Sequence, residues 1–439
     1  MYITWVQTNE AEQIFLSATF NKSVPVNNKI TFQFGAWSKE LTVRIDENLT
    51  DDTIGLSEEL KREVFIPDEL YYQLNLEAGK VILGPVIMYL VSDRFIKKLD
   101  KIKDRLDRIS QHNGLIYVSA PSRINLDSME IEGFYYLPAT EKNESILRKA
   151  TFKPPAAIIK RVAISPSLNK YLADITNGCV FNSRFFNKWD MWNWLSPNNG
   201  VKAHLPNTIA FKRVEDIEEM LKRYQTIYLK PRSGSRGKGI VQIKREDNLY
   251  HITDDKNIKA TGEKLTESKV MEQIIKKKDT YMIQRGVPIQ HNLRNVDFRM
   301  YVQKNETKNW SCTGLLARFA KPGSITTNLH HVDYILKGTE ALKEMYHLDE
   351  EEAEHLEAEI QKTCLNACEL LDEHGHFGDI AVDFILDHDK HLWILEMNKR
   401  YGYKSFLKIG DEDMFNKIIS NQFAYASTIT GFDHKHQLK

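Results

Sequence analysis

Residues 377–400 read FGDIAVDFILDHDKHLWILEMNKR, two apolar runs separated by a polar turn at 387–390. This pattern predicts a buried β-hairpin with Asp383 on its first strand and Glu396 and Asn398 on its second. Residues i and i+2 of a strand point to one face, so Glu396 and Asn398 project together, and the turn can bring Asp383 opposite them. Two carboxylates and an amide oxygen form the all-oxygen ligand set that Mg²⁺ takes beside phosphate oxygens. The alternative is a structural salt bridge, because a buried carboxylate needs a cation or a basic partner.

A second motif lies upstream, where residues 228–243 read YLKPRSGSRGKGIVQI. Two β-type runs, 226–230 and 240–244, flank a glycine-rich loop, residues 233–239, with basic side chains in and around it. Glycines let backbone N–H groups approach an oxyanion closely, so the motif predicts a phosphate-binding loop. A P-loop or a Rossmann turn would open a helix, whereas this loop joins two predicted strands as a hairpin. The alternative for this segment alone is a flexible basic hairpin without a ligand.

The overall composition excludes several classes of protein. The 439 residues suggest two or three domains, and 42% hydrophobic with 27% charged residues is an ordinary globular balance. Sixty basic and sixty acidic residues cancel, so no global positive field indicates nucleic acid as a partner. The longest apolar run, 81–91, is about half of the ~20 residues that a membrane span needs, and it predicts a buried strand instead. With no secretory signal and four cysteines, the chain is expected in the cytosol, with Cys364 and Cys368 as buried thiols.

The pattern of apolar residues divides the chain into three expected domains. Residues 1–80 alternate apolar and polar positions in short runs, which predicts a small β-rich, barrel-like domain. Residues 81–201 alternate strands and helices, which predicts a parallel α/β layer. Residues 202–439 predict an α+β domain that holds both motifs. Its strands are expected at 226–230, 240–244, 282–285, 298–303 and 380–386, with a long helix at 349–374.

The order of these motifs resembles the ATP-grasp superfamily, and in detail its YheC/YheD branch of endospore coat-associated proteins, over roughly residues 80–430. The resemblance implies an ATP-grasp fold preceded by a small β domain and a parallel α/β pre-ATP-grasp domain, with ATP and Mg²⁺ as cofactors. It also implies a carboxylate–amine or carboxylate–thiol ligase with a small-molecule or peptide-like carboxylate acceptor, in the cytoplasm or associated with the spore coat. The alternative is a structural spore coat-associated protein that binds nucleotide without turnover.

The resemblance also implies roles for individual residues. Lys230 would contact the α- and β-phosphates, the loop 233–239 would cover them, and the backbone of 284–287 would hold the adenine edge. The implied nucleotide-binding residues are Lys188, Lys230, Ser233, Gly234, Ser235, Arg236, Gly237, Lys238, Gly239, Gln284, Arg285, Gly286 and Val287. The implied magnesium ligands are Asp383, Glu396 and Asn398, and the implied catalytic residues are Lys230, Arg299, Arg318 and Asn328. For Lys188 the alternative is core packing among its aromatic neighbours.

The chain departs from the family pattern outside the metal-ligand motif. His331 and Val332 stand where relatives carry a glycine pair. Residues 399–402, Lys-Arg-Tyr-Gly, follow Asn398 where relatives usually have a proline and a glycine. Gln290 and His291 occupy the stretch in which relatives carry an acidic ribose contact. These departures concern the acceptor pocket and the ribose contact.

Overall fold

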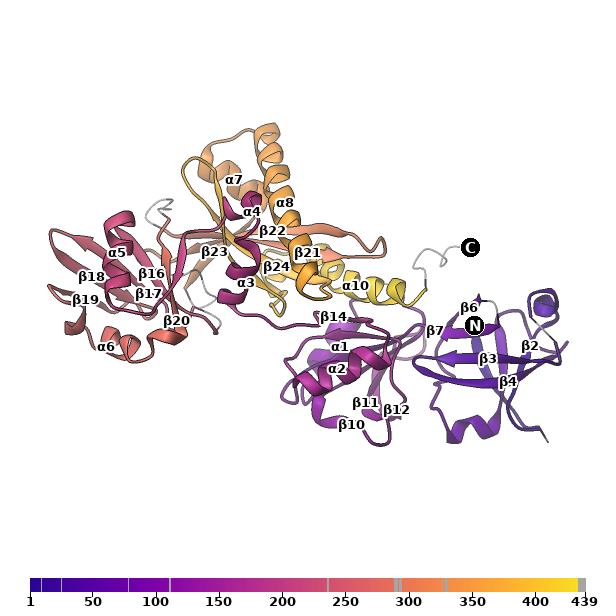
Figure 1. Ribbon diagram of the computed structural model, residues 1–439. Coiled ribbons are helices and arrows are strands. Elements are labelled where there is room, and N and C mark those ends of the chain that lie inside the picture. Colours follow the sequence, from indigo (N-terminus) through magenta and orange to yellow (C-terminus); the bar gives the residue numbers. More distant parts are fainter. Residues whose placement is uncertain are drawn as a thin grey trace.

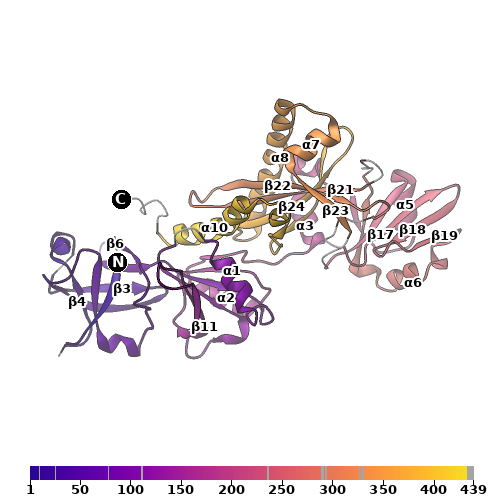
Figure 2. The ribbon, with the colours of Figure 1, turned by 180° about the vertical axis from the view of Figure 1, so that it is seen from behind.

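The computed structural model describes residues 1–439 apart from 9, 25, 78, 110–111, 235–236, 288–290, 292–293, 326, 328–330 and 433–439. The described residues form sheets that lie in a row along an elongated molecule (Figure 1). The N-terminal sheet is at one end of the row and the third sheet along the chain is at the other, as the view from behind also shows (Figure 2). The C-terminal sheet lies between the second and the third, so the chain returns toward the middle of the molecule.

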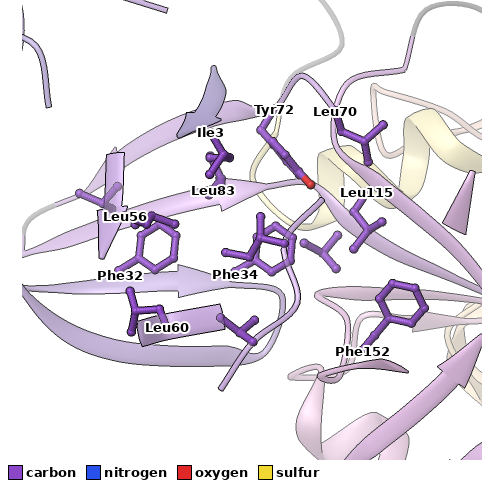
Figure 3. Packing of buried hydrophobic residues seen from close by; sticks show 14 of the residues in the cluster. Ile3, Phe32, Phe34, Leu56, Leu60, Leu70, Tyr72, Leu83, Leu115 and Phe152 are labelled. Carbon is purple, nitrogen blue, oxygen red and sulfur yellow. The ribbon is translucent and has the colours of Figure 1, made fainter. Parts of the chain in front are cut away.

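The N-terminal sheet is mixed and closes on itself. Its strands are β1 (Tyr2–Val6), β2 (Gln13–Leu16), β3 (Lys29–Phe34), β4 (Trp37–Ile45), β5 (Thr53–Ser57), β6 (Gln73–Glu77) and β7 (Lys80–Gly84), in the order β1-β5-β2-β4-β3-β7-β6. Met1 and Tyr72, which precede the two outer strands, exchange backbone hydrogen bonds, and this pairing gives the barrel-like shape that the alternating pattern predicts. Alternate residues of β3 are buried, and Figure 3 shows Phe32 and Phe34 among the aliphatic side chains of this core.

The second sheet combines a parallel centre with an antiparallel flank. Its parallel strands are, in order, β9 (Leu115–Ser119), β8 (Val86–Leu90), β13 (Ala157–Lys160) and β14 (Val180–Phe181), which confirms the predicted parallel layer. Its antiparallel strands are β10 (Ile124–Asn125), β11 (Glu130–Leu137) and β12 (Ile146–Phe152). The prediction of one strand at 81–91 is wrong. Pro85, which has no backbone N–H to donate, separates β7 of the first sheet from β8 of the second.

The third sheet has an apolar face and a polar face. Its strands are β15 (Thr208–Ala210), β20 (Tyr281–Arg285), β16 (Thr226–Pro231), β17 (Val241–Glu246), β18 (Leu249–Asp254) and β19 (Lys259–Gly262), in this order. Ile227 and Leu229 of β16 belong to a core that also includes residues of α5 (Glu215–Tyr224) and α6 (Lys269–Ile275). Because side chains alternate along a strand, Tyr228 and Lys230 point to the other face. The glycine-rich loop joins β16 and β17, as predicted.

The C-terminal sheet carries the predicted carboxylate–amide hairpin. Its strands are β23 (Val332–Lys337), β22 (Trp310–Ala320), β21 (Val296–Lys304), β24 (Asp379–Leu386) and β25 (Leu392–Asn398), in this order. The helices of this part of the chain are α7 (Gly338–Tyr346), α8 (Glu350–Leu371), α9 (Lys404–Lys408) and α10 (Glu412–Ile429). Two further helices, α3 (Lys188–Leu195) and α4 (Asn199–Lys202), lie in the connection between the second and third sheets. Asp349 and Glu352 form a capping box that starts α8, the predicted long helix. Cys364 and Cys368 on α8 are fully buried, which confirms them as core thiols.

The second and C-terminal sheets are joined by a common core and a buried ion pair. Residues of α10 lie in one apolar cluster with residues of both sheets. Arg161, directly after β13, pairs with Asp379 of β24 and donates a 3.1 Å hydrogen bond to the carbonyl of Tyr401. Gln303 of β21 donates to the same aspartate at 2.8 Å. The contacts of Arg161 therefore link the second sheet to the C-terminal sheet and to the segment that follows Asn398. No helix in the described part of the chain is long and apolar enough to cross a membrane.

Candidate functional site

The β24–β25 hairpin brings the predicted carboxylate–amide set together. Asp383 lies directly opposite Glu396, and a bulge at this point shifts the register before Phe384. Asn398 Nδ2 donates a 3.0 Å hydrogen bond to Asp383 Oδ2. Bulges re-aim side chains and are frequent beside functional sites. The three side chains therefore converge on one side of the hairpin, as the spacing predicts, and their role as metal ligands stays a prediction.

Two arginines from neighbouring strands also reach Asp383. Arg299 of β21 lies opposite it and binds both its oxygens, at 2.7 and 2.8 Å. Arg318 of β22 makes the same bidentate contact with Asp297, at 2.8 and 2.5 Å, and its Nη2 lies 3.5 Å from Asp383 Oδ1. Burial alone would raise the pKa of Asp383, but the two guanidinium groups hold it below its usual value. For Asp383, the structural salt bridge that was the alternative is therefore present.

Lys188 connects the two sequence motifs. Its Nζ lies 3.2 Å from Glu396 Oε1 and donates to the carbonyl of Gly234 at 3.1 Å. Lys188 is the first residue of α3, and Asn187 caps this helix in a capping box with Asp190. The same helix buries Met191 in the core. Core packing and a site contact are thus both properties of this segment, because the ammonium at the first residue of α3 reaches the site while Met191, one turn further along, is buried in the core.

The start of the glycine-rich loop rests on α3. The guanidinium of Arg232 lies 5.2 Å from the ring centroid of Trp189, which is stacked on Trp192 at 5.4 Å. Arg232 Nε donates to the carbonyl of Tyr281 at 3.2 Å, and the carbonyl of Arg232 accepts from the backbone N–H of Lys188 at 3.1 Å. These contacts fix the residue that precedes the loop, so they determine where the loop begins.

Within the loop, Gly237 and Gly239 have φ values of +71° and +75°, a conformation that favours glycine. The N–H of Gly239 donates to Asp255 Oδ2 at 3.0 Å. Ser233, Gly234 and Lys238 are exposed. Ser235 and Arg236 lie outside the described residues, and so does Asn328, the predicted catalytic asparagine.

Lys230 and the predicted hinge lie on neighbouring strands of the third sheet. Lys230 is buried, and its Nζ donates a 2.5 Å hydrogen bond to Gln284 Oε1. Burial, and then the charge of Lys188, lower its pKa to about 8, while Glu396 opposes the shift. The backbone N–H of Gly286 donates to the carbonyl of Thr226 at 2.8 Å, which holds the hinge close to β16.

Arg285 of the hinge lies between two aromatic rings. Its guanidinium is 5.3 Å from the ring of Tyr224 and 4.8 Å from that of Trp393 on β25. Cation–π contacts of this kind stabilise by roughly 0.5–1 kcal/mol or more. The side chain of Arg285 therefore connects the third sheet with the C-terminal sheet. Val287, the last residue of the predicted hinge, is partly exposed.

Two lysines beside the site, the buried Lys160 and the half-buried Lys399, were not predicted from the sequence. Lys399 donates to the carbonyl of Phe186, and Lys160 donates to the carbonyl of Ser183 at 2.5 Å. Burial lowers the pKa of both ammonium groups to about 8. The two carbonyls belong to the segment that leads into Lys188, so both lysines help to hold that segment. Sequence spacing could not reveal these contacts, because the partners are 213 and 23 residues apart.

Two of the three predicted ligands, Glu396 and Asn398, offer an oxygen to a hard cation, whereas both oxygens of Asp383 already accept hydrogen bonds. Asn398 uses its amide nitrogen on Asp383, which leaves its amide oxygen available. Glu396 is 28% exposed, with one of its oxygens on Lys188. Carboxylate and amide oxygens are the donors that Mg²⁺ accepts together with water and phosphate oxygens. No group of three or more His, Cys, Asp and Glu side chains among the described residues is placed to hold a metal ion.

A glycine-rich hairpin on one sheet and a carboxylate–amide hairpin on another, joined by a lysine, define a protein of the ATP-grasp class. The model of the YheC/D-like ATP-grasp family matches residues 177–429, and the chain belongs to this family.

Two relatives with a curated description come from the same bacterium. The chain is 26% identical over 398 residues to the endospore coat-associated protein YheD of Bacillus subtilis strain 168. This match covers 87% of this chain and 86% of the relative. It is 24% identical over 306 residues to the endospore coat-associated protein YheC of the same strain, covering 68% and 78%. Among solved structures it is similar to the VanG D-Ala:D-Ser ligase of Enterococcus faecalis, with 14% identity, a TM-score of 0.45, and coverage of 76% of this chain and 98% of that chain.

Proposed function

We propose that the chain is an ATP- and Mg²⁺-dependent ligase that activates the carboxylate of a small-molecule or peptide-like acceptor for attack by an amine or a thiol. The observation that carries the proposal is the position of Lys188. Its ammonium contacts Gly234 of the phosphate-type loop and Glu396 of the metal-type hairpin, at 3.1 and 3.2 Å. Both predicted halves of the site therefore meet at one cation. Membership of the ATP-grasp family supports ATP as the nucleotide.

The side chains suit phosphoryl transfer by positioning and charge neutralisation, which needs no covalent nucleophile. In the proposed reaction the γ-phosphoryl group passes from ATP to a carboxylate oxygen, ADP leaves, and the amine or thiol then displaces phosphate. Lys188 and Lys230 would bind phosphate oxygens with the N–H groups of the glycine-rich loop. Arg299 and Arg318 would stabilise charge on the transferred group. Bound Mg²⁺, held by Asp383, Glu396 and Asn398, would neutralise charge between the phosphates.

The test of this function is ADP release by the purified full chain with ATP, Mg²⁺ and a panel of amino acids and short peptides. We expect release that depends on Mg²⁺ and on one acceptor class, and we expect Glu396→Ala to lose nearly all of it while the fold stays intact. Glu354→Ala, an exposed position on α8, is the matched control. Full activity in Glu396→Ala would reject the proposed site.

A second candidate function is nucleotide binding without turnover in a spore coat-associated structural protein. Two observations favour it. The relatives YheD and YheC are described as endospore coat-associated. In addition, Asp383 already accepts hydrogen bonds from Arg299 and Asn398 on its two oxygens. Both candidates predict that ATP with Mg²⁺ raises the melting temperature, because a ligand that binds the folded state stabilises it. Only a ligase would also release ADP. In the proposed function the ligase acts in the cytoplasm or at the spore coat.

A further inference from the structure

Three side chains on the polar face of the third sheet form one chain of hydrogen bonds. Thr208 Oγ1 donates to the carbonyl of Pro206 at 2.8 Å. Gln284 Nε2 donates to Thr208 Oγ1 at 3.0 Å, and Lys230 Nζ donates to Gln284 Oε1 at 2.5 Å. The chain therefore runs from a backbone carbonyl at the edge strand β15 to the ammonium of Lys230.

Every bond in this chain has a fixed direction. A carbonyl can only accept, so Thr208 must use its single proton on Pro206. The oxygen of Thr208 is then an acceptor, and the amide nitrogen of Gln284 is the donor that faces it. The amide oxygen of Gln284 is consequently turned toward Lys230. The reversed amide would turn its NH2 group toward the ammonium, donor against donor, and its oxygen toward the Thr208 oxygen, acceptor against acceptor. Both contacts are unfavourable in a buried position.

The sheet register holds the three residues in contact. Thr208 and Gln284 are directly opposite each other on β15 and β20. Lys230 of β16 lies opposite Met282, two residues from Gln284, so Lys230 and Gln284 are diagonal neighbours on one face. The exposed fractions of Thr208, Gln284 and Lys230 are 1%, 2% and 8%. Water therefore has little access to compete for these hydrogen bonds.

We propose that Thr208 and Gln284 are positioning residues that hold Lys230 by an uncharged acceptor, so that its ammonium keeps its full charge for a phosphate oxygen of the nucleotide. This inference rests on the proposed function, because it assumes that Lys230 binds phosphate. A glutamate in place of Gln284 would hold the lysine in the same position but would neutralise it. The amide thus supplies geometry without charge.

The charges around Lys230 lead to a dependence on pH. Lys188 on α3 disfavours its charge, Glu396 on β25 favours it, and the ring of Tyr228 on its own strand lies 5.6 Å from Nζ. Burial is the largest influence, and the pKa of Lys230 is lowered to about 8. Phosphate binding requires the ammonium form, so the affinity for ATP should fall as the pH rises above about 8.

The first test is titration of the full chain with ATP and Mg²⁺ between about pH 6.5 and about pH 9.5, in the wild type and in Gln284→Glu. The carboxylate should raise the pKa of Lys230, so we expect the alkaline loss of affinity to move up by about one pH unit or more. At about pH 7 the variant should bind ATP about tenfold more weakly, because the lysine is already neutralised. Gln242→Glu is the matched control, since Gln242 lies on β17 and donates to Tyr228 Oη at 2.7 Å.

The second test uses Thr208→Val and Thr208→Ser. Valine keeps the shape but removes the acceptor for Gln284, so ATP affinity should fall about fivefold or more. Serine keeps the hydroxyl and should restore affinity to within about twofold of the wild type. If wild-type protein binds ATP and neither the alkaline limit in Gln284→Glu nor the affinity of Thr208→Val changes, the positioning role is wrong. If the wild type binds no ATP between about pH 6.5 and about pH 9.5, the proposed function itself is wrong.

Discussion

Replacement of Asp383 by alanine should destabilise the fold far more than replacement of Glu396, although both are predicted metal ligands. The side chains of Asp383 and Arg299 are 11% and 14% exposed, and Asp383→Ala leaves the buried guanidinium without either oxygen that it binds. Removing one partner of a buried ion pair costs about 3–5 kcal/mol. The side chain of Glu396 is 28% exposed, and Lys188 keeps its hydrogen bond to Gly234 when this carboxylate is removed. The loss for Glu396→Ala should therefore stay below about 1 kcal/mol.

Urea and thermal unfolding of the two alanine variants measure this difference. For a domain of about 150–250 residues, a loss of 1 kcal/mol in the free energy of unfolding lowers the melting temperature by about 2–4 °C. Asp383→Ala should therefore lower the melting temperature by about 6–20 °C. The double variant Arg299→Met with Asp383→Ala should recover part of that loss, because no unpaired charge remains buried. Equal destabilisation by Asp383→Ala and Glu396→Ala would show that the buried ion pair with Arg299 does not stabilise the fold in this way, and so would a double variant that is less stable than Asp383→Ala.

Further predictions concern the contacts around the site. Arg161→Met should reduce the free energy of unfolding by about 3–5 kcal/mol in urea denaturation, because it leaves Asp379 buried and unpaired, while Arg94→Met at an exposed position should change it by less than about 0.5 kcal/mol. Trp189→Leu should weaken ATP binding about two- to fivefold in a titration, since Arg232 loses its aromatic support at 5.2 Å, and an unchanged affinity would contradict this. Burial lowers the pKa of Lys160 from 10.5 to about 8, so the unfolded chain holds this proton more tightly, and stability should rise with pH from about 8 toward 10.5. Lys160→Met should remove this part of the rise in unfolding experiments at about pH 7.5 and about pH 9.5; an identical rise in both proteins would contradict it.

The parts of the site that follow from local spacing could be predicted from the sequence. Glu396 and Asn398 are two residues apart on one strand, and a short turn returns the chain to Asp383. Strand geometry alone therefore brings the three side chains together. The hairpin around the glycine-rich loop was predictable for the same reason, since β-type runs flank it closely.

The partners of these residues could not be predicted, because they come from distant parts of the chain. Lys188 and Glu396 are 208 residues apart, and Arg299 and Asp383 are 84 apart. Nothing in the local pattern around Gln284 indicates that its side chain holds Lys230, because the contact depends on the order of strands in the third sheet. The prediction of one strand at 81–91 was wrong for a local reason. Both sides of Pro85 are apolar, so the pattern indicated one continuous strand where the structure has β7 and β8.

A metal–nucleotide site at the β24–β25 hairpin can be tested by calorimetric titration of the full chain with ATP. The titration is run with Mg²⁺ and with EDTA, on the wild type and on Glu396→Ala. We expect the wild type to bind ATP in the presence of Mg²⁺, and we expect both EDTA and Glu396→Ala to weaken binding by about tenfold or more. Binding that is the same with Mg²⁺ and with EDTA, and the same in both proteins, would contradict a metal–nucleotide site at this hairpin.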